Sequence, residues 1–180
     1  MSLAPRISPG DRRDVGVVSW VIATISGRVA GTGPPNLFMT LGRHRRLFFG
    51  WLHFAGRLMP GGRLPRRDTE LVILRTAHLR DCQYEFEHHR HLAGKAGVSA
   101  TEIERLTSDP GAPEWSARER ALLAACDELH REQDLSDSSW RALSEHLDDR
   151  SIIELVLLVG HYQMLATFIA ALRVEPDVRR

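Results

Sequence analysis

The sequence predicts an all-α protein. Apolar residues recur at spacings of three and four along most of the 180 residues, which is typical of helices with one buried face. Two capping boxes, Ser99 with Glu102 and Ser116 with Glu119, mark helix starts. No segment keeps the apolar–polar alternation of a half-buried strand. With 43% hydrophobic residues, the chain is expected to form a contiguous core.

Residues 1–35 are expected to form an N-terminal arm, and residues 36–180 a single helical domain. Pro5, Pro9 and Gly10 open the arm, and glycine and proline close it over residues 31–35. Between them, residues 15–29 are apolar and rich in β-branched side chains, so helix and strand are hard to separate. We interpret the arm as a short helix that packs on the body or on a second subunit.

The body is expected to contain about six or seven helices. Asn36 is an N-cap candidate for the first helix, and Asp68 or Thr69 starts the second, whose inward stripe ends at His78. Aromatic residues crowd the first helix, which must then be buried inside the chain or between subunits: Phe38, Phe48, Phe49, Trp51 and Phe54. The expected helices cover approximately residues 36–55, 68–81, 82–96, 100–106, 116–129, 136–147 and 148–172.

The charge balance excludes a strongly basic or acidic protein. The chain has 24 Lys and Arg against 23 Asp and Glu, which argues against a nucleic-acid partner. No apolar run approaches the ~20 residues needed to span a bilayer, and the first residues lack a signal-peptide profile, so we expect a cytoplasmic protein with no membrane partner. The two cysteines, Cys82 and Cys126, do not make a disulfide framework.

The chemically informative residues gather around one predicted helix. At about 100° per residue, Glu85 lies about 60° and His89 about 20° from Cys82 around the helix that begins at Cys82, so the three share one face. At the helix N-terminus, Cys82 is expected to be favoured as a thiolate by the helix dipole. Glu70 comes from the preceding helix, among apolar neighbours, and is expected to contact His89.

This layout is typical of a proton relay, with the sulfur of Cys82 as a potential nucleophile at its outer end. A carboxylate that reaches an imidazole raises its basicity and can exchange a proton with it. Metal binding is not expected, because neighbours on a helix diverge by about 100° and only His89 with Glu85, or His88 with His91, can converge. Glu70, Cys82, Glu85 and His89 are therefore the candidate catalytic residues.

The segment from Glu70 to His89 resembles the carboxymuconolactone decarboxylase family, which also contains alkylhydroperoxidase D-like proteins. The peroxidase branch carries Glu, eleven residues, Cys, two residues, Cys, three residues and His. Glu70, Cys82 and His89 fall on these positions, and Glu85 stands where the second Cys would be. The resemblance covers roughly residues 36–172 and implies a compact alkylhydroperoxidase D-like bundle that assembles into a homodimer or trimer.

Because the second cysteine is missing, the sequence resembles the branch of the family that contains the lactone decarboxylases. The resemblance implies an enzyme that needs no cofactor and that uses Glu and His to move a proton on a small carboxylated lactone or related acid. It also implies that His130 and His161 line the pocket, and with Tyr84 they are the candidate substrate-binding residues.

Two alternatives stay open at this point. One is a thiol-dependent peroxidase that uses Cys82 alone, with an external thiol to resolve the oxidised sulfur. Cys126 lies on another predicted helix, where core packing is expected. The other is a structural oligomer of the same fold without catalytic activity.

Overall fold

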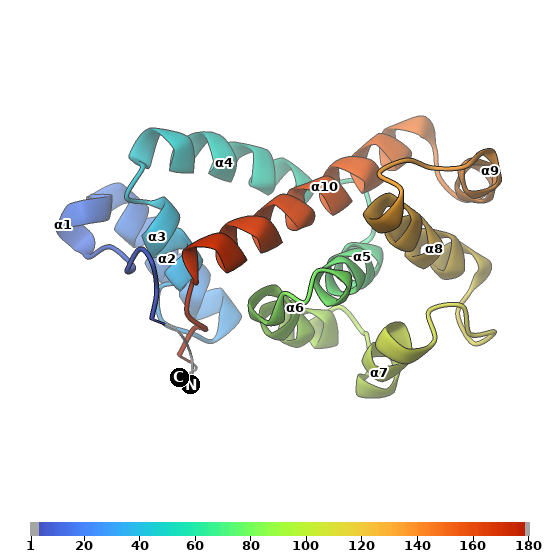
Figure 1. Cartoon of the computed structure of the whole chain (residues 1–180), viewed down its shortest axis with the longest axis horizontal. Helices are drawn as coiled ribbons and strands as arrows, with labels where there is room; N and C mark the ends of the chain where they lie inside the picture. The colour runs from blue at the N-terminus through green and yellow to red at the C-terminus, as the bar shows by residue number, and fades with distance from the viewer. Residues whose placement is uncertain (1–3, 179–180) are drawn as a thin grey trace. The chain divides into compact units, whose positions relative to one another are not determined.

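The computed structural model describes residues 4–178 and confirms the all-α class. Within these residues there are ten helices, more than the six or seven expected. In chain order they are α1 (Arg12–Val15), α2 (Val17–Ala30), α3 (Asn36–Leu41), α4 (Arg45–Leu58), α5 (Arg66–Leu79), α6 (Gln83–Lys95), α7 (Ala100–Ser108), α8 (Ala117–Arg131), α9 (Asp137–Ser144) and α10 (Asp149–Leu172) (Figure 1).

The additional helices have local causes. Two of them, α1 and α2, lie in the segment expected to be an arm with one short helix. The long helix expected over residues 36–55 is split into α3 and α4, because the side chain of His44 accepts the backbone N–H of Leu47 and so starts a new helix. Asn36 is the first residue of α3 rather than its N-cap, which is Pro35.

The capping boxes start α7 and α8 at the expected positions. The Ser99 hydroxyl accepts the N–H of Glu102, and the Ser116 hydroxyl accepts the N–H of Glu119, with each Glu carboxylate reaching back to its serine. The second body helix, α5, starts earlier than expected, since Pro65 is its N-cap in place of Asp68 or Thr69. A proline fits a helix start because it has no N–H to leave unsatisfied.

The chain divides into two compact units, of which the first comprises Met1–Gly56 with Thr167–Arg180. In this unit α2 packs against α1 and α3. The buried face of α2 carries only small side chains, those of Ser19, Ala23 and Gly27. A Cβ atom at Gly27 would meet the Gly33 carbonyl, so the glycine permits a close backbone approach there. The aromatic residues of α4 are only partly buried, with Phe48 inaccessible and Phe49 and Phe54 exposed.

The second unit is Arg57–Ala166, and α5 is its most buried helix. It packs against α6, α7 and α8 (Figure 1). All residues from Asp68 to Ala77 are buried, so α5 is enclosed on every side, whereas His78, expected on an inward stripe, is exposed. One core cluster comprises Leu71, Leu74, Ala93, Val98, Ile103, Leu106, Ala112, Trp115 and Leu123.

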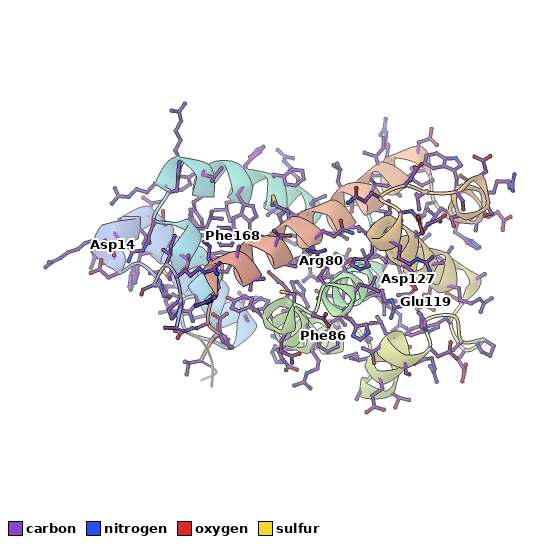
Figure 2. The ribbon with its side chains drawn as sticks, viewed as in Figure 1. Asp14, Arg80, Phe86, Glu119, Asp127 and Phe168 are labelled. Carbon is purple, nitrogen blue, oxygen red and sulfur yellow. The ribbon has the colours of Figure 1, made fainter. Side chains whose placement is uncertain are left out.

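Charged residues of α5 bind the neighbouring helices. Arg75 forms a two-pronged ion pair with Asp127 of α8, with N–O distances of 2.6 and 2.9 Å. Arg67 lies 2.9 Å from Glu119, and both acidic residues lie on α8 next to α5 (Figure 2). Planar guanidinium groups suit such paired contacts with carboxylates. These bonds fix the side of α5 that faces α8 and therefore fix the rotation of the helix about its axis.

The loop before α5 is held by a carboxylate of α10. Glu154 accepts the backbone N–H of Arg63 at 2.7 Å and that of Leu64 at 3.0 Å. A Cβ atom at Gly62 would overlap the Glu154 carboxylate and the Leu58 carbonyl. The absence of a side chain at Gly62 is thus required for this close contact.

By length and composition alone, α10 is apolar enough to cross a bilayer, with a mean hydropathy of 1.8 over its most apolar window. The expectation that no apolar run approaches that length is therefore wrong for α10. Of this apolar stretch of α10, 44% is buried inside the protein, and core helices of soluble proteins can be equally long and apolar. The helix is weak evidence for a membrane span.

Candidate active site

Glu70 and His89 are in direct contact inside the second unit. Glu70 lies in the second turn of α5 and is inaccessible to solvent, and His89 of α6 is 2% exposed. The His89 Nδ1 atom lies 2.8 Å from the Glu70 Oε2 atom, so the contact expected from the sequence is present. A buried carboxylate requires a donor or a cation, and Glu70 has both.

The cation is Arg66, one helical turn before Glu70. Its guanidinium lies 2.6 Å from the second carboxylate oxygen, Oε1, of Glu70. The Arg66 side chain is 40% exposed and the Glu70 side chain is inaccessible, so the pair runs from the surface into the core. Both oxygens of Glu70 are therefore used, one by Arg66 and one by His89.

Tyr162 of α10 meets the other ring nitrogen of His89. Its hydroxyl oxygen lies 3.0 Å from Nε2, and the two rings are nearly perpendicular, with centroids 5.1 Å apart. Burial, followed by the nearby carboxylates Glu85 and Glu70, raises the pKa of Tyr162 well above its usual value. Tyr162 is therefore a neutral phenol that can donate its proton to the Nε2 lone pair.

Glu85 approaches the same nitrogen. Its Oε2 atom lies 3.5 Å from His89 Nε2, one helical turn away on α6, and its side chain is 4% exposed. An imidazolium at His89 would thus have a carboxylate near each ring nitrogen, Glu70 at Nδ1 and Glu85 at Nε2. When the ring is neutral, the Tyr162 hydroxyl can donate to Nε2.

Cys82 is the N-cap of α6 and is 6% exposed. Burial raises the pKa of its thiol, and the negative charge of Glu85 acts in the same direction. The backbone N–H groups of Glu85 and Tyr84 favour the thiolate but do not outweigh burial. The expectation that the helix N-terminus makes Cys82 a thiolate is therefore wrong for this structure.

Of the three candidate substrate-binding residues, His161 is the one beside the network. It is 5% exposed, and its ring is perpendicular to that of Tyr162 at a centroid distance of 5.3 Å. Burial first, and then the proximity of His89, lowers the pKa of His161 to about 4. His161 is therefore neutral at physiological pH.

Tyr84 and His130 are less directly placed. Tyr84 is half-buried in the first turn of α6, where its backbone N–H faces the Cys82 thiol. His130 is half-buried in the last turn of α8, and no hydrogen bond or ring contact within the described chain joins it to His89. Cys126 is inaccessible in α8, as expected for core packing, and burial raises its pKa to about 12. Across residues 4–178, no three metal-binding side chains converge.

Part of the sequence is similar to a known protein family. Residues 46–128 match the model of the carboxymuconolactone decarboxylase family, and they contain Glu70, Cys82, Glu85 and His89. The matched segment belongs to the carboxymuconolactone decarboxylase family. No curated protein matches the sequence.

Solved structures show that the alkylhydroperoxidase D-like fold extends beyond this family segment. An uncharacterized peroxidase-related protein from Silicibacter sp. TM1040 has a TM-score of 0.81 at 17% identity, over 91% of this chain and 87% of that one. An alkylhydroperoxidase AhpD core protein from Ralstonia eutropha JMP134 has a TM-score of 0.81 at 17% identity, over 97% and 94%. The debrominase Bmp8 has a TM-score of 0.78 at 16% identity, over 96% and 92%.

Two members of the network were not among the candidates from the sequence. Arg66 stands four residues before Glu70, and this i, i+4 spacing on one helix was a signal that could have identified it. Tyr162 is separated from His89 by 73 positions. Tyr162 follows His161 in an apolar segment, but no local sequence pattern relates it to His89.

Proposed function

We propose that the protein is a carboxymuconolactone decarboxylase-like enzyme that removes CO₂ from a small carboxylated lactone or a related acid. The observation that carries this proposal is the placement of His89, whose two ring nitrogens are engaged by Glu70 and Tyr162 inside the protein. An imidazole held in this way exchanges protons at one defined atom, which is what decarboxylation requires of its acid–base group.

The chemistry follows from the partners of His89. When the substrate carboxylate leaves as CO₂, the electron pair of the broken C–C bond stays on a carbon conjugated with a carbonyl group, as an enolate. The imidazolium of His89 donates its Nε2 proton to that carbon and forms the new C–H bond. The neutral ring keeps its proton on Nδ1, which donates to the Glu70 carboxylate, and Nε2 accepts a hydrogen bond from the Tyr162 hydroxyl. A proton from water then restores the imidazolium.

Substitution of the relay tests this proposal. We expect Glu70→Gln and His89→Asn each to lower turnover by roughly 10²–10⁴-fold, the usual contribution of a general acid–base group. The assay measures CO₂ release from carboxymuconolactone and related carboxylated lactones.

The matched control is Glu87→Gln, because Glu87 lies on α6 like His89 but forms a surface ion pair with Arg90. The control should keep full activity, and all variants should keep the helical circular dichroism of the parent. Full activity of folded Glu70→Gln would contradict the proposal.

A second candidate function is a thiol-dependent peroxidase. Cys82 is the residue that carries this candidate, because its thiol lies at the N-cap of the helix that holds Glu85 and His89, while burial and the charge of Glu85 oppose its ionisation. The fold neighbours also include peroxidase-related proteins. In this reaction the Cys82 thiolate attacks one peroxide oxygen, the O–O bond breaks, and the alcohol or water leaves with a proton. A first external thiol then attacks the sulfenic acid, water leaves, and a mixed disulfide forms. A second external thiol attacks this disulfide, which regenerates the Cys82 thiol and leaves the two external thiols joined as a disulfide.

Cys82→Ser separates the two functions. We expect the variant to retain decarboxylation within a few-fold, because the serine keeps the size and polarity of the N-cap. If the protein is a peroxidase, the same change abolishes peroxide consumption, whereas Cys126→Ser leaves it unchanged because Cys126 is inaccessible. Peroxide turnover by the parent protein that is lost only in Cys82→Ser would replace the decarboxylase proposal.

A further inference from the structure

Arg66 occupies a position that helix stability alone does not favour. It is the first residue of α5, where a positive charge opposes the helix dipole, and the order Arg before Glu is the weaker one for an i, i+4 pair. Its partner, Glu70, is inaccessible to solvent, and the N–O distance is 2.6 Å. The ion pair therefore stabilises the buried carboxylate of Glu70 more than it stabilises the helix.

The charge of Arg66 reaches His89 through Glu70. The contacts form a chain from the Arg66 guanidinium to Glu70 Oε1, from Glu70 Oε2 to His89 Nδ1, and from His89 Nε2 to the Tyr162 hydroxyl. With an anionic Glu70, Nδ1 must donate, and Nε2 is left to accept from Tyr162. If Glu70 were protonated, it would donate to Nδ1 and the ring proton would move to Nε2.

Other titratable groups surround this chain. From α6, Glu85 lies 3.5 Å from His89 Nε2, and the His88 ring is 5.3 Å from that of His89. Cys82 lies beside Glu85, and from α10 His161 lies next to Tyr162. Of the charged residues named, Glu70 and Glu85 are carboxylates close to His89, and Arg66 is a cation that contacts Glu70.

We propose that Arg66 is a positioning residue of the relay, which keeps Glu70 anionic and makes Nε2 the nitrogen of His89 that gains and releases the proton. Without this cation, the buried pair of Glu70 and His89 binds its second proton more tightly, because an uncompensated buried negative charge attracts protons. The inference rests on the proposed proton transfer by His89, but its test does not require turnover.

The test is an NMR titration of protein labelled at the histidine nitrogens, with His89→Asn to assign the His89 signals. In the parent, Nδ1 should stay protonated and Nε2 should titrate. In Arg66→Met, we expect the midpoint at Nε2 to rise by about one pH unit or more. Arg66→Lys restores the cation and should return the midpoint close to that of the parent. Arg90→Met, which removes an exposed arginine paired with Glu87, should leave it unchanged.

Two results would overturn the inference: an unchanged Nε2 midpoint in folded Arg66→Met, or a parent protein in which Nδ1 titrates instead of Nε2. If Arg66→Met does not fold, Arg66→Gln supplies the neutral side chain for the same measurement. Where decarboxylation is detectable, its pH profile should move in the direction of the NMR midpoint. A shifted midpoint without decarboxylase activity would uphold the role of Arg66 and contradict the proposed function.

Discussion

His161 is a histidine that the protein holds in its neutral form. It is 5% exposed, and burial together with the nearby His89 lowers its pKa from 6.5 to about 4. An unfolded chain exposes this ring to water and binds a proton to it below about pH 6.5. Between pH 6.5 and 4 the unfolded state therefore carries more protons than the folded state, so folding stability falls as the pH falls through this window.

We expect His161 to contribute to acid denaturation. The shift from 6.5 to about 4 corresponds to roughly 3 kcal/mol of stability, present at neutral pH and lost by about pH 4. His161→Gln removes the titrating ring, so its free energy of unfolding should depend less steeply on pH. Urea unfolding of parent and variant between about pH 7 and 4.5 measures the difference.

The control for this experiment is His91→Gln, at an exposed position of α6. Its stability should follow the pH dependence of the parent. Parallel curves for the parent and His161→Gln would show that His161 is readily protonated in the folded protein.

The local part of the site was predictable, and the part made by distant residues was not. Cys82, Glu85 and His89 share one helix face because helix geometry fixes the angle between them. Glu70 was paired with His89 because a carboxylate among apolar neighbours needs a donor, and the contact is present. The Cys82 pKa was predicted with the wrong sign, because the helix dipole is visible in the sequence and burial is not.

At the scale of elements, α2 has an unusual distribution of side chains. It buries Ser19, Ala23 and Gly27 and exposes larger β-branched residues, from 41% at Val21 to 63% at Val29. The exposed apolar residues are Val17, Val18, Val21, Ile25 and Val29. An apolar surface of this kind on a helix is typical of an interface, and the expected homo-oligomer would cover it with a second copy.

We expect α2 to mediate self-association. Ile25 is 55% exposed near the middle of this surface, and Ile25→Glu would place a charge in an apolar contact. Light scattering at micromolar concentration should show an oligomer for the parent protein and a shift to the monomer for Ile25→Glu.

Ile153→Glu provides a matched control, because Ile153 is 61% exposed on α10. It should leave the oligomer intact. A monomeric parent would remove the prediction of assembly, and dissociation by Ile153→Glu alone would move the interface from α2 to α10.

The helix boundaries show which local signals are reliable. Where a serine and a glutamate cap each other, as at Ser99 and Ser116, the helix starts at the predicted residue. The break between α3 and α4 was missed, because it depends on a histidine side chain acting as the cap. A helix that starts at Asp68 or Thr69 does not include Arg66, so the expected start does not relate Arg66 to Glu70. The observed α5 begins at Arg66 and includes both residues.

At the scale of the molecule, the all-α class followed from the sequence because helical periodicity is a local property. The number of helices and their partners depend on contacts between distant residues. Arg75 binds Asp127 across 52 positions, and Tyr162 meets His89 across 73. No spacing rule in one sequence relates such positions, so the Tyr162 end of the relay required the structure.

The contact between Gly62 and Glu154 constrains the evolution of two distant positions. Any side chain at position 62 would overlap the carboxylate that binds the N–H groups of Arg63 and Leu64, and it would also overlap the Leu58 carbonyl. Shortening Glu154 therefore relieves only part of the overlap, and losing Glu154 leaves two peptide groups without their acceptor. Neither change is neutral, so we expect both residues to be retained across related sequences. We therefore expect the sequence of the loop before α5 to change little among related proteins.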